Sequence, residues 1–317
     1  MADILKGLAG KSTFLIAWTF AAAIMVGAVV LFLLPAALDV GLATFLKDWS
    51  ESTAGLVLLA VVVLLGFTLA ATSTPLYRLL EGYVWPQRLM NWGIRRQQDR
   101  KRRLRGHLDQ LPASTLIDSA LVWERLSRYP ADDNQVAPTR LGNALRAFET
   151  YGLDRYRLDS QTFWNELLAL VPKSLQDELD NSRTATDFFV ATFYLTALYG
   201  LVALALAALK LADHRPIDYS LVVQGIVPLL LGPIVSYRLA ISSTTYWANT
   251  VQAMVNIGRV QLARSMGLKM PSTLEAERKM WTAVSKLVFY PYDPGPIREL
   301  DAFRDSATDT SQASPAP

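Results

Sequence analysis

Residues 14–34 read FLIAWTFAAAIMVGAVVLFLL, a run of 21 residues that contains no charged side chain. As an α-helix this run spans roughly 31 Å, which matches the ~30 Å hydrocarbon core of a bilayer. A helix buried in a soluble domain needs only about 10–14 apolar residues, and the apolar region of a cleaved signal peptide has about 7–15. The run therefore predicts a transmembrane helix that stays in the protein.

Three more uncharged runs follow, at residues 54–71, 188–209 and 219–237. Hydrophobic residues make up 51% of the chain, only slightly above a globular average, but they are unevenly placed and fill these four runs almost without interruption. The charged residues lie between the runs. This distribution predicts four transmembrane helices.

The segments outside the runs space their apolar residues as helices do and show no convincing alternation with a period of two. The predicted fold class is all-α: a four-helix transmembrane bundle with a cytoplasmic helical domain built from the segment between the second and third spans and from the C-terminal segment. The predicted division is a transmembrane hairpin at 1–75 (spans 14–34 and 54–71), a helical domain at 76–186, a second hairpin at 187–242 (spans 188–209 and 219–237), helices at 243–300 and a disordered tail at 301–317.

Two apolar stripes define the core expected outside the membrane. One is Leu141, Ala144, Leu145 and Phe148, and the other is Leu274, Trp281, Val284 and Val288. Ser272 and Glu275 are spaced as a capping box for the second stripe. Within the spans, small residues four apart favour close contact between helices of one chain or of a homo-oligomer; these pairs are Ala23/Gly27, Gly66/Ala70 and Ala203/Ala207.

The orientation follows from lysine and arginine residues near the ends of the spans. Seven lie on one side, and three, Lys47, Lys210 and Arg215, lie on the other. Because positively charged loops stay in the cytoplasm, we expect both termini and the long central segment on the cytoplasmic side.

The block Pro138-Thr-Arg-Leu-Gly-Asn143, continued by Ala-Leu-Arg146-Ala-Phe-Glu149 and by Arg155-Tyr156, Asp159 and Trp164, carries a resemblance. It is similar to a block of bacterial multi-pass membrane proteins whose function is uncharacterised. The resemblance covers about 35 residues and the four-helix layout around them. It implies a bacterial cytoplasmic (inner) membrane and no particular chemistry.

The same block places Arg140, Asn143, Arg146 and Glu149 on adjacent turns of one predicted helix. One interpretation is structural: a salt-bridged helix surface, or a polar clasp of Arg140 with Asp154 or Asp159. The other is a partner-binding site, in which the two guanidinium groups hold a carboxylate. We take these four residues as the candidate contact surface for a protein partner that the sequence does not identify.

A basic run precedes this block. Residues 76–110 carry nine positive and three negative charges, and most of the positive ones lie close together: Arg95, Arg96, Arg100, Lys101, Arg102, Arg103 and Arg105. We expect this run to contact anionic lipid headgroups, since each basic residue near a membrane surface adds about 1 kcal/mol. A second interpretation pairs the run with the acidic segment that follows. Nucleic acid is disfavoured because no stacking aromatic lies within the run.

Composition limits the chemistry that this chain is expected to perform. The chain has no cysteine and two histidines, so we expect no disulfide, no thiolate metal site and no other metal site or cofactor. Lys11 follows Gly10, but the first glycine that a phosphate loop requires is absent. We see no catalytic constellation and expect no enzyme. The predicted function is a membrane-anchored scaffold or signalling component; the alternative is an oligomeric channel or small transporter whose pore is lined by the fourth span.

Overall fold

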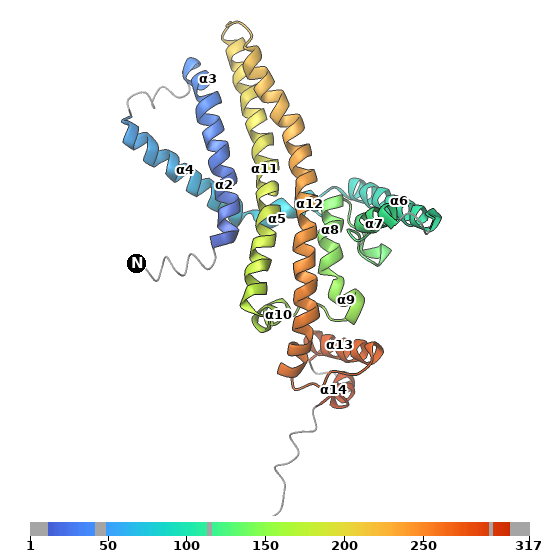
Figure 1. Ribbon diagram of the computed structural model, residues 1–317. Helices are drawn as coiled ribbons and strands as arrows, with labels where there is room; N and C mark the ends of the chain where they lie inside the picture. The colour runs from blue at the N-terminus through green and yellow to red at the C-terminus, as the bar shows by residue number, and fades with distance from the viewer. Residues whose placement is uncertain (1–11, 42–48, 113–115, 292–293, 305–317) are drawn as a thin grey trace, which may run out of the picture. The chain divides into compact units, whose positions relative to one another are not determined.

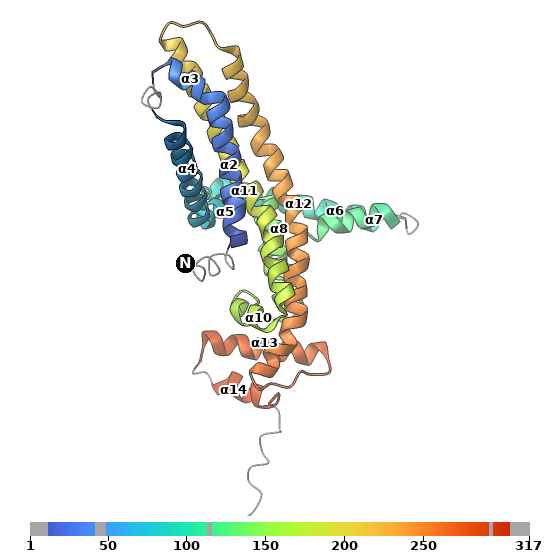
Figure 2. The same cartoon turned by 60° about the vertical axis from the view of Figure 1, so that its left-hand side comes forward.

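The computed structural model describes residues 12–41, 49–112, 116–291 and 294–304 (Figures 1 and 2). In these ranges the chain forms helices and no strand. In chain order they are α2 (Ser12–Ala28), η1 (Val29–Leu33), α3 (Leu34–Asp39), α4 (Glu51–Ala71), α5 (Ser73–Glu81), α6 (Gln87–Gln110), α7 (Leu116–Leu126), η3 (Asp133–Gln135), α8 (Arg140–Glu149), α9 (Tyr151–Tyr156), α10 (Trp164–Leu170), α11 (Lys173–Ala212), α12 (Tyr219–Ser265), α13 (Leu274–Phe289) and α14 (Pro294–Asp301).

The helices form two compact units, each made of separate stretches of sequence. Unit 1 contains Met1–Met90, Thr139–Leu141 and Asp180–Tyr246. Unit 2 contains Asn91–Pro138, Gly142–Leu179 and Trp247–Pro317. The predicted division placed the two hairpins in separate domains, whereas both pairs of apolar helices belong to unit 1. Of the predicted disordered tail, residues 305–317 lie outside the described ranges, and Asp301 is the last residue of α14.

Four helices are long and apolar enough to cross a membrane, which confirms the four predicted spans at that level. They are the continuous helix Leu15–Asp39, α4, α11 and α12. The helix α4 begins where Ser50 accepts a hydrogen bond from the backbone N–H of Thr53, at 3.3 Å. The helices α11 and α12 extend well beyond their apolar runs, with 40 and 47 residues.

Glycines bring the apolar helices of unit 1 into close contact. A Cβ atom on Gly66 would lie 2.7 Å from the Cα of Thr19 on α2, and one on Gly232 would lie 2.6 Å from Thr196 on α11. Ala203 is fully buried in a cluster of the first, third and fourth apolar helices. Two of the three predicted pairs of small residues are therefore used inside the chain. The third is not, because a Cβ on Gly27 would meet nothing within 4 Å.

Polar side chains connect the ends of these helices. The ammonium of Lys210 contacts Asp39 at 3.1 Å and Asp218 at 3.0 Å, and Asp218 also accepts from the backbone of Leu221. Elsewhere in unit 1, Tyr77 of α5 donates to the buried Asp187 of α11 at 2.8 Å. Burial raises the pKa of Tyr77, so its hydroxyl keeps the proton that it donates.

The core of unit 2 forms around α8, α13 and the second half of α12. The rings of Phe148 and Trp247 pack with their centroids 5.0 Å apart. The predicted stripe on α8 is confirmed, since its four members are between 0% and 4% exposed. On α13 the prediction was wrong in part: Trp281 and Val284 are buried, but Leu274 and Val288 are each 46% exposed.

The structure corrects two predictions for α13. Its cap is Thr273, which accepts a hydrogen bond from the N–H of Ala276 at 3.3 Å, in place of the predicted Ser272. Its inward face includes Glu277, which accepts from Arg259 at 2.8 Å. A partnered carboxylate can be buried, so the stripe that enters the core is not purely apolar and could not be located from hydrophobic spacing alone.

Candidate functional site

The helix α6 carries the basic run, and its two faces differ. Gly93, Gln97 and Lys101 are buried and recur every four residues along one face. A Cβ on Gly93 would lie 2.7 Å from the carbonyl oxygen of Pro138, so only glycine allows this close approach. Arg105 continues this face and is about half exposed. The other arginines lie away from it: Arg95, Arg96, Arg102 and Arg103 are exposed, and Arg100 is half-buried.

Lys101 corrects the predicted lipid-contacting set. Its side chain is 3% exposed, and its ammonium donates to the carbonyls of Pro130 and Ala131 at 2.7 and 3.0 Å and contacts Asp133 at 2.5 Å. An ammonium held by three internal acceptors cannot reach a lipid headgroup. The second interpretation of the basic run, pairing with the following acidic segment, is therefore correct for Lys101.

Asp133 is held at this position by its cationic neighbours. The hydrogen bond from Lys101 lowers the pKa of the Asp133 carboxyl below its usual value of 3.8, and the nearby charges of Lys101, Arg105 and Arg102 act in the same direction. Arg105 lies 3.6 Å from the same carboxylate. The preceding Asp132 accepts from the N–H of Asn134, which shapes the short helix η3. These contacts fasten the loop after α7 onto α6.

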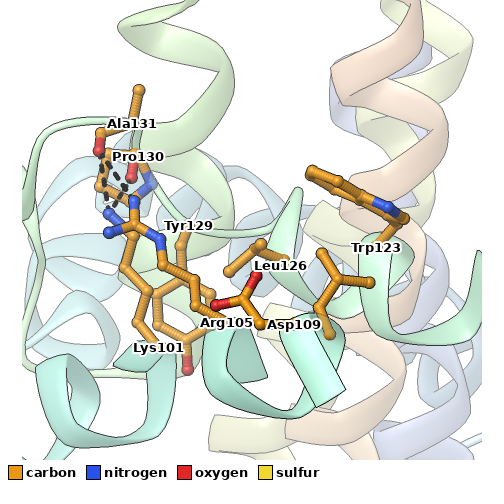
Figure 3. Close-up of a pocket in the computed structure, with 9 residues that line it drawn as sticks. Lys101, Arg105, Asp109, Trp123, Leu126, Tyr129, Pro130 and Ala131 are labelled. Carbon is orange, nitrogen blue, oxygen red and sulfur yellow. Dashed lines mark hydrogen bonds between the residues drawn. The ribbon is translucent and has the colours of Figure 1, made fainter. Parts of the chain in front are cut away.

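A hollow of about 470 Å³ lies within unit 2, between α6, α7 and the start of this loop. Figure 3 shows Lys101 and Arg105 on one side, Trp123 on the other, and Asp109 and Leu126 between them. The other residues that line it are Leu108, Tyr129, Pro130 and Ala131. Tyr129 is fixed by a hydrogen bond from its hydroxyl to Gln97 at 2.9 Å.

The hollow combines apolar surface with a few polar groups. Leu108 and Leu126 are half-buried, and Trp123 is 58% exposed although it is the largest side chain there. The side chain of Arg105 is about half exposed, and Asp109 is exposed four residues further along α6. Such a surface can receive an apolar side chain and hold a charged group beside it. Among the described residues there is no cluster of histidine, aspartate and glutamate able to bind a metal.

The sequence-predicted contact surface on α8 has members with different surroundings. Arg140 is exposed, whereas Asn143 is fully buried. The side-chain amide of Asn143 accepts a hydrogen bond from the N–H of Ala137 at 2.8 Å and donates one to the C=O of Ala137 at 2.9 Å. Arg146 donates to Gln135 from two nitrogens and lies 3.8 Å from Glu149. Burial raises the pKa of Glu149, an effect that Arg146 partly offsets. Asn143 thus supports the loop before α8 and cannot face a partner.

The predicted clasp partners of Arg140 make other contacts. Asp154 accepts a hydrogen bond from Thr150, and Asp159 accepts from the backbone and hydroxyl of Thr162. The clasp in unit 2 is instead built around Arg259. Its guanidinium bonds Glu277 and lies 4.2 Å from the ring centre of Tyr156.

The sequence interpretation did not identify the hollow. Leu116, Trp123 and Leu126 have helical spacing, but Leu116 and Trp123 are exposed and Val122 is the buried residue of α7. The sequence held only a weak signal for the hollow. Trp123 stands beside the charged residues Glu124 and Arg125 on a short helix, and this helix follows an arginine-rich one.

The comparisons with known proteins give no relative from which these features could be interpreted. The chain matches no family model, no curated protein and no solved structure. The resemblance of residues 138–164 to bacterial multi-pass membrane proteins therefore stays a prediction. The structure defines the class of protein: an all-helical chain with four helices apolar and long enough to cross a membrane.

Proposed function

We propose that this protein is a membrane-anchored scaffold or signalling component of the bacterial inner membrane, with both termini and unit 2 on the cytoplasmic side. The four apolar helices would hold it in the bilayer, and unit 2 would bind a protein partner. The asymmetry of lysine and arginine near the spans supports this orientation.

The hollow between α6 and α7 is the observation that carries the proposal. Protein interfaces concentrate their binding energy where an anchor side chain enters a pocket, and tryptophan and arginine are enriched there. Trp123 and Arg105 flank a hollow of suitable size and are exposed. We expect the partner to place an apolar side chain over Leu126 and a carboxylate against Arg105.

Site-specific photocrosslinking in living cells tests this proposal. A benzophenone amino acid replaces Trp123 in the full chain, and a matched variant carries it at the exposed Arg125 on the same helix. We expect one discrete protein adduct from position 123, weakened by Arg105→Ala, and none from position 125. Equal adducts at both positions, or no adduct at position 123, would refute the hollow as the partner site.

The polar face of α8 is a second contact surface within the same proposal, now reduced to Arg140, Arg146 and Glu149. Arg140 is exposed and Arg146 is more than one third exposed, so both guanidinium groups can be reached. The exposed arginines of α6 other than Arg105, which is assigned to the protein partner, are proposed to contact anionic lipid headgroups. Ala23 is exposed and Gly27 has no close neighbour, which suits contact with a second copy of the chain.

The channel alternative receives less support from the surface of α12. Its glycines at 225 and 232 face α11. Its exposed large side chains in the apolar section are Tyr219 at the end of the helix and then Val223, Ile226, Val227, Leu230, Leu231, Ile234 and Val235. A water-filled pore is usually lined by polar groups, whereas such a face suits lipid. Purified protein in liposomes should therefore pass no ions in a flux assay, and sustained flux would favour the channel.

A further inference from the structure

The first turns of α7 expose large apolar side chains to an unusual degree for a unit that is not made of membrane helices. Leu116 is 76% exposed, Ile117 is 78% exposed and Leu121 is 46% exposed. The side of α7 that packs inward is different and contains Val122. These three residues, which we call the α7 tip, therefore do not contribute to the core of unit 2.

The end of α6 lies close to the α7 tip. Only five residues separate Gln110 from Leu116. Each residue of a fully extended chain spans at most about 3.3–3.6 Å, so the end of α6 cannot lie far from the start of α7. Trp123 of α7 and Asp109 of α6 line one hollow, which places the two helices side by side as a hairpin. The α7 tip is therefore at the outer end of this hairpin.

The helix that precedes the α7 tip is strongly positive, although the charged residues nearest the tip, Asp118 of α7 and Asp109 of α6, are exposed acids. From Asn91 to Gln110, α6 carries seven positive and two negative side chains. Lys101 is neutralised inside the unit, but Arg102 and Arg103 are exposed in the last turns before the tip. Their contacts are weak and largely solvent-exposed, at 3.6 Å to the carboxylate and 3.4 Å to the carbonyl of Asp99.

From this juxtaposition we infer that the α7 tip inserts into the headgroup region of an anionic bilayer while Arg102 and Arg103 contact lipid phosphates. Apolar residues next to basic ones are the composition of segments that bind membrane surfaces. A second copy of the same hairpin is a poorer occupant, because two arginine-rich helices would repel each other. The inference rests on the proposed membrane anchoring, which keeps a lipid surface at high local concentration.

The experiment uses the absence of cysteine from the natural chain. A single nitroxide is attached to the full protein through Ile117→Cys, and a matched control through Arg125→Cys. Both proteins are reconstituted in vesicles of phosphatidylcholine, with and without phosphatidylglycerol. Collision of the nitroxide with oxygen, which concentrates in the bilayer, is compared with collision with a water-soluble nickel complex present on both sides.

With phosphatidylglycerol we expect the label at position 117 to gain oxygen collisions and lose nickel collisions several-fold, and the label at 125 to stay exposed to nickel. Adding Arg102→Gln and Arg103→Gln should reverse the change at 117. Equal nickel exposure at 117 and 125 overturns the inference. Low exposure at 117 to both reagents also overturns it, and spin–spin broadening that unlabelled protein removes would identify a second copy as the occupant.

These outcomes are separate from the test of the hollow. A missing adduct at position 123 removes the protein-partner site and leaves the lipid result unchanged. A water-exposed label at position 117 removes the lipid contact and leaves the adduct unchanged.

Discussion

Lys101 illustrates how much one residue of a charged run can differ from its neighbours. Its ammonium satisfies two backbone carbonyls and one carboxylate, whereas Arg102 beside it is exposed. Lys101→Met should lower the free energy of unfolding of unit 2 by roughly 1.5–3 kcal/mol, the range for hydrogen bonds to a charged group. The matched change Arg102→Met should stay within about 0.5 kcal/mol. Thermal melts of the two variants in detergent measure the difference, and equal melts would contradict the burial of Lys101.

The carboxylate of Asp133 makes part of this stability depend on pH. Because its pKa is lowered in the folded state, the unfolded chain binds more protons in the window between the folded pKa and the usual value of 3.8. The stabilisation is therefore present above that usual value and is lost as pH falls through the folded pKa. Asp133→Asn should be less stable than wild type at neutral pH and should lose less stability on acidification. Melting temperatures from neutral pH down to about pH 3 test this, and parallel pH curves would refute it.

The buried face and the exposed face of α8 should respond differently to single substitutions. Leu145 is 4% exposed in the core, so Leu145→Ala should cost about 2–5 kcal/mol through the cavity that it leaves. Arg140 is exposed, and Arg140→Ala should change stability by no more than about 0.5 kcal/mol. If melting shows a large loss for Arg140→Ala, its role is structural, and it leaves the proposed contact surface.

At the scale of elements, the contact between α2 and α4 depends on one position without a side chain. A Cβ on Gly66 would be 2.7 Å from the backbone of Thr19, so Gly66→Val should separate the helices or strain them, at roughly 1–3 kcal/mol. Gly27→Val places the same side chain where nothing lies within 4 Å and should be tolerated in a monomer. Melting in detergent compares them. A loss for Gly27→Val alone would indicate that this face contacts a second copy.

The apolar helices could be predicted from the sequence because their signal is local: about twenty adjacent residues without a charge are enough. The hollow was not predictable because it depends on which face of α6 the loop after α7 covers. Gly93, Gln97 and Lys101 share a helix face in the sequence, but a lysine there reads as solvated until its three acceptors are known.

At the scale of the whole molecule, the testable property is topology. Ser50 is exposed at the start of α4, and the side chain of Lys279 on α13 is 72% exposed. In the proposed orientation, a cysteine at Ser50 should react with a membrane-impermeant reagent added to intact cells, and one at Lys279 should react only after lysis. The absence of natural cysteines removes background. Reaction of both positions in intact cells would contradict the placement of unit 2 in the cytoplasm.

The cluster that joins Leu33 and Ala36 to Ala203 and Leu221 has a consequence for synthesis in the cell. A ribosome makes Leu33 long before Leu221, and at roughly 5–20 residues per second the interval is on the order of 10–40 s. During that time the first hairpin lacks its native neighbours, and Asp39 lacks the ammonium of Lys210. The newborn protein therefore depends on lipid, or on the cell's insertion machinery, to shield the first hairpin until the second arrives.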